Sequence, residues 1–388
     1  MVYPVNRPTP IRTDGSNWFA HNTMRVRVPD IIREVLDLNP DYPASIRHAL
    51  ETLIDGLETN APVPMLDLPA PDYDEWAVAC AFRRGDTWEN TDWFFAENYV
   101  YRQVIQAVRW WETARDPFAP KKAEELAGNR LWYLLDEALA IEGTVEERLS
   151  ALIHRALWGN RIDLSYAPSL EHGHAAGADD LLVDESAQAV RCLLDGHGPV
   201  HIVADNAGTE LALDLALADR LLDGVTNAVI VHLKMHPTFV SDATLPDALR
   251  FLDLLNDGGH GKAVAAFGER LRRALEAKRL RFAPDLYWNG SRILRNLPPR
   301  LEDGFRHARL VIFKGDANYR RMVGDILWPP ETPLARVVER FPAPVLALRS
   351  LKSDPIVGLP PGLAEQIDAI DPAWHTNGRR GIIQTAAK

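Results

Sequence analysis

The chain has 388 residues, and its 43 Lys and Arg against 54 Asp and Glu give a formal net charge of −11. This acidic balance argues against a nucleic-acid or acidic-membrane partner, although it allows a local basic pocket. No run approaches the roughly 20 consecutive apolar residues that span a bilayer. The start of the chain lacks an apolar leader, and two cysteines, Cys80 and Cys192, are too few for a disulfide framework. We therefore expect a cytoplasmic globular protein, with more than one core at this length.

The first part of the chain has the apolar spacing of helices. From Ile31 to about Ala156 apolar residues recur at helical intervals, as in PDIIREVLDL, ASIRHALETLIDGL, DWFFAENYVYRQVIQAVRWWETA and LWYLLDEALAIEG, with no convincing alternating strand. Pro29 suits the first turn of a helix. Glycine, alanine and turn-forming residues then gather over 165–180, which is typical of a connection. The sequence predicts a mainly helical domain or cap over residues 1–170.

The second part has a different pattern, with short apolar runs that alternate with helical segments. This pattern is typical of a parallel sheet with crossover helices, so residues 171–388 are predicted to form an α/β domain with an αβα sandwich. Four of the apolar runs end in polar residues, and in α/β proteins ligands gather beyond the carboxyl ends of strands. We therefore expect these polar residues to share one crevice. They are Asp205 and Asn206, Asp242, the segment from Gly315 to Arg321, which is predicted to be a loop, and Lys352.

The acids and the amide of this set match a hard cation. Mg²⁺ and Mn²⁺ prefer carboxylate and amide oxygens, and Mg²⁺ takes one or two carboxylates together with waters and phosphate oxygens. Asp205, Asn206 and Asp242 would form such a sparse site. Each residue has an alternative role. Asp and Asn are common turn formers and helix N-caps, and Asp242 is also placed to cap the helix that follows it.

The basic residues of the set match a phosphate group. Arginine binds phosphate through a planar fork and lysine as a point charge, so Arg320 or Arg321 would hold a phosphoryl group with Lys352. The alternative is that the arginines pair with surface acids and that Lys352 is an ordinary surface lysine. The glycine-rich segment 258–262, GGHGK, lacks the first glycine and the hydroxyl of a phosphate loop, so we interpret it as a flexible loop.

Four motifs in order carry a resemblance to a known family: ADNAGTE, LKMHPTFVSD, FKGDANYRRMVGD followed by Trp328, and LRSLK. They resemble the metal-dependent damage-control phosphatases, also called domain of unknown function 89. The most similar branch is that of the sugar-phosphate phosphatases and the proteins called acidic-residue methyltransferases. FFAENYVYRQ and LWGNRIDLS resemble that branch too, so the resemblance covers nearly the whole chain.

The resemblance implies roles for particular residues. Asp205, Asn206 and Asp242 would bind the divalent metal and take part in catalysis together with Lys352, and Glu210 would line the same site. Ser350 stands where the branch has threonine, which bears on the substrate range. Asn160 and Asp163 would approach from the helical half. The residues implied to contact substrate are Glu210, Asp316, Ala317, Asn318, Tyr319, Arg320, Lys352 and Asn160.

The function that the resemblance implies is hydrolysis of small phosphorylated metabolites, with fructose phosphates or other sugar phosphates as favoured substrates. The cofactor would be Mn²⁺, Mg²⁺, Co²⁺ or Ni²⁺, and the partner a small phosphate ester. Two alternatives stay open at this point. One is a methyltransferase that uses S-adenosylmethionine to methylate protein glutamates, and the other is a protein that binds sugar phosphates without turning them over.

Overall fold

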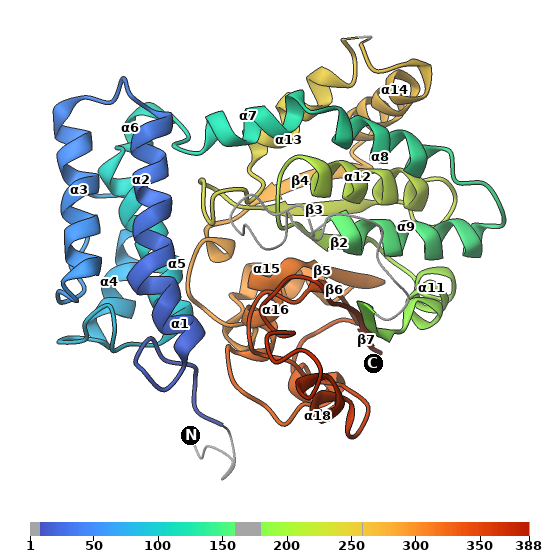
Figure 1. The fold of residues 1–388 in the computed structure, drawn as a ribbon. Helices are drawn as coiled ribbons and strands as arrows, with labels where there is room; N and C mark the ends of the chain where they lie inside the picture. The colour runs from blue at the N-terminus through green and yellow to red at the C-terminus, as the bar shows by residue number, and fades with distance from the viewer. Residues whose placement is uncertain (1–7, 160–179, 258, 388) are drawn as a thin grey trace.

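The computed structural model describes residues 8–159, 180–257 and 259–387, and its centre is a seven-stranded sheet between two layers of helices (Figure 1). The strands lie in the order β1-β7-β6-β5-β2-β3-β4. All neighbouring pairs are parallel except β6 and β7. The predicted α/β sandwich with a mostly parallel sheet is confirmed. The strands are β1 (Leu181–Asp184), β2 (Val200–Val203), β3 (Val229–Leu233), β4 (Leu280–Pro284), β5 (Leu310–Lys314), β6 (Val345–Ser350) and β7 (Gly381–Ala386).

One face of the sheet is covered by long amphipathic helices. Alternate residues of β2 and β5, such as Val200, Ile202, Leu310 and Ile312, are buried against these helices, because successive side chains of a strand point to opposite faces. The helices that share this core are α8 (Asn129–Leu139), α9 (Val145–Gly159), α11 (Ser186–Asp195), α12 (Thr209–Leu222), α13 (Leu245–Leu254) and α14 (Lys262–Glu276).

The other face is covered by shorter elements that pack on Val203, Val311 and Phe313. One of them, α16 (Gly315–Val323), begins at once after β5. The segment Gly315 to Arg321, predicted as a loop, is therefore helical, and the loop prediction is wrong. Its six residues after the glycine form a regular helix once the glycine has made the turn out of the strand. The remaining elements on this face are η3 (Leu286–Trp288), η4 (Leu294–Asn296), α15 (Pro299–Phe305), α17 (Leu334–Val337) and α18 (Leu363–Asp368).

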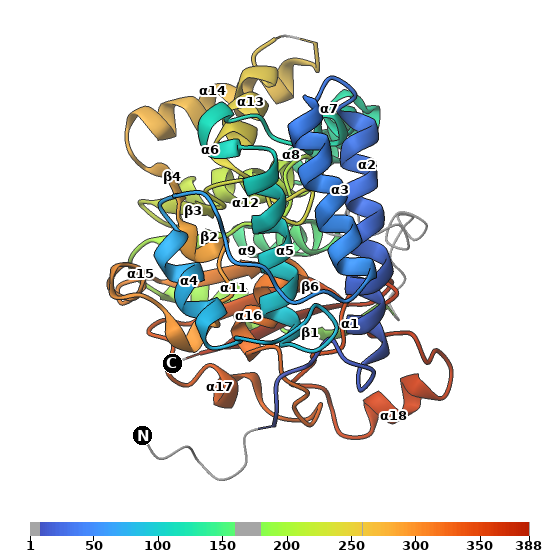
Figure 2. The same ribbon diagram turned by 90° about the vertical axis from the view of Figure 1, so that its left-hand side faces the viewer.

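The N-terminal helices form a unit with its own core, in which Trp76, Trp88 and Tyr99 are buried. Pro29 lies in the first turn of its helix α2, as predicted. Figure 2 shows these helices standing in front of the sheet. We call them the helical unit: α1 (Trp18–Asn22), the π-helical turn η1 (Thr23–Arg27), α2 (Val28–Leu38), α3 (Ala44–Glu58), α4 (Tyr73–Ala81), α5 (Trp93–Ala107) and α6 (Trp110–Thr113).

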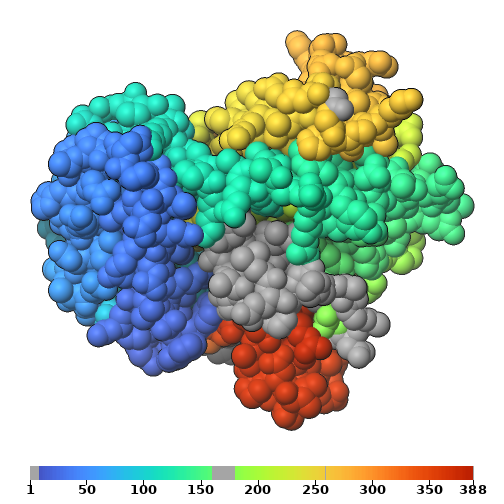
Figure 3. All heavy atoms as spheres, turned by 45° about the horizontal axis from the view of Figure 1, so that its top comes forward, coloured from blue at the N-terminus to red at the C-terminus, as the bar shows by residue number. Residues whose placement is uncertain are grey.

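The chain then runs through α7 (Ala119–Ala127) to α8 and α9, and Figure 3 shows this teal to green part of the chain extending away from the blue helical unit. α8 and α9 contribute Leu135 and Ile153 to the core between the sheet and the long helices, and not to the core of the helical unit. The predicted division between residues 170 and 171 lies outside the described residues and stays a prediction. Within the described ranges, the chain has no helix of the length and apolarity that a membrane crossing requires.

Candidate active site

The polar residues singled out from the sequence follow strands that lie side by side. β6, β5, β2 and β3 are consecutive parallel neighbours, so their carboxyl ends lie along one edge of the sheet. Asp205 follows β2, Asp242 lies in the loop after β3, Asp316 follows β5 and Lys352 follows β6. The expected convergence at the carboxyl edge is therefore present in the fold.

A small cavity of about 50 Å³ lies at this edge, between the sheet and the helical unit. This volume has room for only a few water molecules. The sheet side supplies most of the predicted site residues, and the helical unit supplies aromatic and charged ones that the sequence analysis did not single out. The lining residues are Phe19, Arg27, Trp93, Glu97, Asp205, Asn206, Phe239, Asp242, Asp316, Ala317, Arg320, Lys352 and Ser353.

The carboxylate of Asp205 fits against the backbone of Gly315. A Cβ atom at Gly315 would lie 1.8 Å from Asp205 Oδ2, and the φ of this glycine is +80°. Both facts require glycine, because other residues rarely adopt a positive φ and any side chain would collide with the acid. Gly315, the first residue after β5, thus leaves space for the Asp205 side chain at the end of the neighbouring strand β2.

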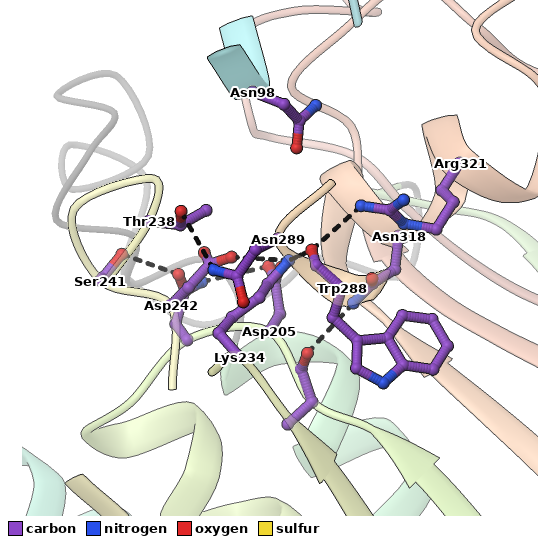
Figure 4. A network of polar contacts seen from close by, with 12 residues as sticks. Asn98, Asp205, Lys234, Thr238, Ser241, Asp242, Trp288, Asn289, Asn318 and Arg321 are labelled. Carbon is purple, nitrogen blue, oxygen red and sulfur yellow. Dashed lines mark hydrogen bonds and ion pairs between the residues drawn. The ribbon is translucent and has the colours of Figure 1, made fainter. Parts of the chain in front are cut away.

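Asn206 and Asp242 are held side by side by the backbone. They form an antiparallel bridge, in which the Ala243 amide donates to the Asp205 carbonyl at 2.7 Å. The Ser241 hydroxyl donates to Asn206 Oδ1 at 2.7 Å (Figure 4). All of these side chains are buried. The loops after β2 and β3 therefore place two carboxylates and an amide within one small region.

Asp242 is not the cap of α13, because Thr244 occupies that position and forms a capping box with Asp247. Its carboxylate instead pairs with Lys234, with 3.0 Å between Nζ and Oδ2. Lys234 also donates to the Trp288 carbonyl at 2.8 Å (Figure 4). Burial, and the positive charge of Arg321, lower the pKa of Lys234 although Asp242 opposes the shift. The alternative of a capping role for Asp242 is thereby removed.

Asp316 fixes the backbone that carries Lys352. Its carboxylate accepts hydrogen bonds from Arg349 Nε at 2.7 Å, the Ser353 hydroxyl at 2.6 Å and the Lys352 amide at 3.2 Å. Burial raises the pKa of Asp316, but the charges of Arg349 and Arg320 outweigh it and leave the pKa lowered. Asp316 is thus an ionised anchor between the start of α16 and the end of β6.

Arg320 lines the cavity, but its guanidinium is engaged by protein acids. It donates to Glu97 of the helical unit and, at 2.7 and 3.2 Å, to both carboxylate oxygens of Asp325. It also lies over the Trp93 ring, 3.6 Å from the centroid. The acids it pairs with are buried, not exposed as the alternative from the sequence had it. Its predicted contact with substrate stays a prediction.

Two predicted residues, Asn318 and Tyr319, lie behind the cavity wall. Asn318 donates to the carbonyls of Ala204 and Lys314 at 3.1 and 2.9 Å. The Tyr319 hydroxyl donates to Gln384 at 3.2 Å, and burial raises its pKa to about 12. Neither residue is part of the cavity lining. As folded here, both hold strand ends in place.

Glu210 also lies behind the wall, in a buried ion cluster that the sequence analysis missed. Lys314 Nζ is 3.0 Å from Glu210 Oε1 and 3.0 Å from Asp214 Oδ1, while Asn206 Nδ2 donates to Glu210 Oε2 at 2.9 Å. The neighbouring acids raise the pKa of Lys314 to about 12 against the effect of burial. The cluster thus places one lysine between two acids beneath Asn206. Asn160 and Asp163 lie outside the described residues.

The donor set at the cavity fits a divalent cation that keeps several waters. Two carboxylates and one amide oxygen, from Asp205, Asp242 and Asn206, are the kind and number of ligands that Mg²⁺ takes from proteins beside phosphate. Among the described residues, no group of three or more His, Cys, Asp or Glu side chains is arranged to hold a metal. That Asp205, Asn206 and Asp242 hold a metal therefore stays a prediction.

A mostly parallel sheet with a polar cavity at its carboxyl edge defines an α/β protein, the class in which ligands bind at the strand ends. Residues 23–367 match the family model described as the damage-control phosphatase ARMT1-like domain. The chain belongs to this family, and the resemblance found in its motifs is confirmed.

Its relatives are similar over almost their whole length. The damage-control phosphatase ARMT1 of Xenopus tropicalis is 29% identical, over 96% of this chain and 97% of the relative. The human protein of the same name is 26% identical, over 94% and 96%. A solved structure, of a DUF89 family protein from Pyrococcus horikoshii, has a TM-score of 0.49 and 15% identity, covering 91% of this chain and 94% of that one.

Proposed function

We propose that this protein is a divalent-metal-dependent phosphatase of small phosphorylated metabolites, with sugar phosphates such as fructose phosphates as its substrates. The observation that carries the proposal is the convergence of two acids, an amide and a lysine from three strand ends on one cavity. Membership of the damage-control phosphatase family supports the same reaction. The expected cytoplasmic location stays a prediction.

The residues that line the cavity would have different roles in phosphate ester hydrolysis. Asp205, Asn206 and Asp242 would hold the metal, which when bound supplies a positive charge that polarises phosphoryl oxygens and orients a water. Lys352 would place its ammonium on the phosphoryl group, where charge builds up in the transition state. Asp316 keeps the Lys352 backbone in position through their 3.2 Å hydrogen bond.

The small size of the cavity limits how a substrate could enter it. Because it has room for only a few waters, a sugar phosphate would enter only when the helical unit and the sheet edge move apart. Closure would then exclude bulk water from the reacting groups. Arg320 with Glu97 and Trp93 lies between these two parts, so this cluster would separate or shift during entry.

The test is free phosphate release from a panel of phosphate esters, with and without Mn²⁺, Mg²⁺, Co²⁺ or Ni²⁺. We expect release that requires the cation and is fastest with sugar phosphates. Binding of sugar phosphates without release would instead favour the non-catalytic alternative. Methyl transfer from S-adenosylmethionine to protein glutamates, without phosphate release, would favour the methyltransferase.

Lys352 provides the matched variant for this assay. Lys352→Met keeps most of the side-chain volume and removes the charge, and we expect kcat/KM to fall about 100-fold because one charge contact to the transition state is lost. Lys262, at the start of α14, lies in the discounted glycine-rich segment, so Lys262→Met is the control and should leave phosphate release unchanged. Wild-type turnover by Lys352→Met would contradict the single-cavity assignment.

A further inference from the structure

Glu97 is an acid of the cavity wall that the proposed reaction does not use. α5 of the helical unit carries it, and only 6% of its side chain is exposed. It lines the cavity opposite the residues that follow β2, β3 and β6. A nearly buried carboxylate needs partners for its oxygens, because burying a charged group without them is costly.

The two oxygens of Glu97 differ. Oε2 accepts a hydrogen bond from Arg320 Nη1. Oε1 has no hydrogen-bond partner within residues 8–159, 180–257 and 259–387, and it is not among the polar atoms sealed away from solvent. Since the residue lines the cavity, we take Oε1 as the oxygen available to a group bound there.

The carboxylate is also held in a fixed orientation. Arg320, its partner, is pinned by Asp325 at 2.7 Å and stacks on the Trp93 ring at 3.6 Å. An acceptor whose orientation is fixed by its neighbours in the closed site is suited to selecting one kind of group, because ordering it costs little entropy.

The chemistry of the cavity narrows what Oε1 can accept. A phosphoryl group is an anion and would be repelled by a carboxylate. A cation on Glu97 is disfavoured too, because the Arg320 guanidinium already lies against this carboxylate and would repel it. A donor on the organic part of the substrate remains. We propose that Glu97 binds a hydroxyl group of the substrate and thereby selects polyhydroxylated phosphate esters, an inference that rests on the proposed function.

This assignment gives the cavity two ends. The phosphoryl group lies at the sheet edge, beside Asp205, Asp242 and Lys352, and the polyol lies against α5. A substrate without hydroxyl groups leaves Glu97 buried without a partner, and a site built in this way rejects such analogues strongly. The helical unit therefore sets specificity, whereas the sheet edge carries the reaction.

The experiment compares fructose 6-phosphate with phenyl phosphate in the full-length protein with Mn²⁺. Glu97→Gln keeps the hydrogen bond to Arg320 but removes the charge that strengthens the hydroxyl contact, so the ratio of the two kcat/KM values should fall about ten-fold, through KM for the sugar ester. Asp325→Asn is the control, because it removes the other charge on Arg320 from a residue that does not line the cavity. This control should keep the wild-type ratio.

Three results would contradict the proposed role of Glu97, and a second variant covers the case in which the first does not fold. An unchanged ratio in Glu97→Gln, or an equal fall in Asp325→Asn, would overturn the role of Glu97. A greater loss for phosphoethanolamine than for fructose 6-phosphate would overturn it as well, because Glu97 would then select an ammonium group. If Glu97→Gln does not fold, Glu97→Asp, which keeps the charge but withdraws the oxygens, should show the same loss of preference.

Failure of the proposed phosphatase function can be distinguished from failure of the role of Glu97. If wild type releases phosphate from no ester, calorimetric titration still tests Glu97. Fructose 6-phosphate should then bind Glu97→Gln about ten-fold more weakly than wild type, with inorganic phosphate weakened less. Equal weakening of both, or no binding of the sugar ester to wild type, would overturn the inference.

Discussion

The polar residues at the strand ends form two layers that differ in their partners. The front layer lines the cavity and includes Asp205 and Lys352, whereas the back layer, with Lys314, Glu210 and Asp214, satisfies its charges internally. Both layers come from the same sequence motifs. The place of a residue in a motif therefore does not show whether it would contact the substrate or would support the residues that do. We expect substitutions in the front layer to lower activity and substitutions in the back layer to lower stability.

The largest effect is expected from Asp205→Asn in the front layer. The amide has the same size and keeps the fit against Gly315, but one of the two carboxylates proposed to hold the metal is lost. We expect kcat/KM to fall about 1,000-fold, which is comparable to the loss of a major electrostatic contact in an active site. The free energy of unfolding, measured by urea titration, should change by less than about 1 kcal/mol. Asp205 is the cleaner choice, because replacing Asp242 also leaves Lys234 buried without its acid. Activity and metal response like those of wild type would reject the metal assignment.

The back layer should respond in stability. Lys314→Met leaves Glu210 and Asp214 buried without their cation, so we expect the free energy of unfolding to fall by about 3 kcal/mol. Arg270 offers a control, since its ion pair with Asp219, also on α12, is nearly half exposed on the arginine side. Arg270→Met should cost less than about 1 kcal/mol. Equal losses for the two variants in urea titrations would remove the distinction between the layers.

A smaller effect should appear in the pH dependence of stability. Burial raises the pKa of Asp214 to about 7, with Glu210 adding to the shift and Lys314 opposing it. Because the folded protein holds this proton up to a higher pH than the unfolded chain, the contribution of Asp214 is most favourable at low pH and declines as pH rises. The difference in unfolding free energy between wild type and Asp214→Asn should fall from about pH 4 to pH 7, by up to about 1.4 kcal/mol per pH unit. A difference that is flat over this range would contradict the raised pKa.

The arrangement of the sheet edge was predictable because it depends on local patterns. Apolar runs marked β2, β3, β5 and β6, and parallel strands bring their carboxyl ends together. The turn from β5 into α16 was not predicted, because the positive φ of Gly315 depends on its contact with Asp205. A glycine after a strand is equally compatible with a loop.

The far wall of the cavity was not predictable from the pattern of the chain. Trp93 and Glu97 read as part of an amphipathic helix, and only the docking of the helical unit brings them to the sheet edge. The same holds for Lys314, which looks like the end of a strand until α12 places two acids beside it. Tertiary packing decides these positions, and spacing along the chain carries no signal of it.

The central claim is that the front layer forms one site for metal and phosphate, and a crystal soaked with Mn²⁺ and inorganic phosphate tests it most directly. The account predicts Mn²⁺ on Asp205 and Asp242, with the anion between the metal and Lys352 and within hydrogen-bonding distance of its ammonium. An anion bound at the 258–262 segment, or a metal that contacts neither acid, would contradict it.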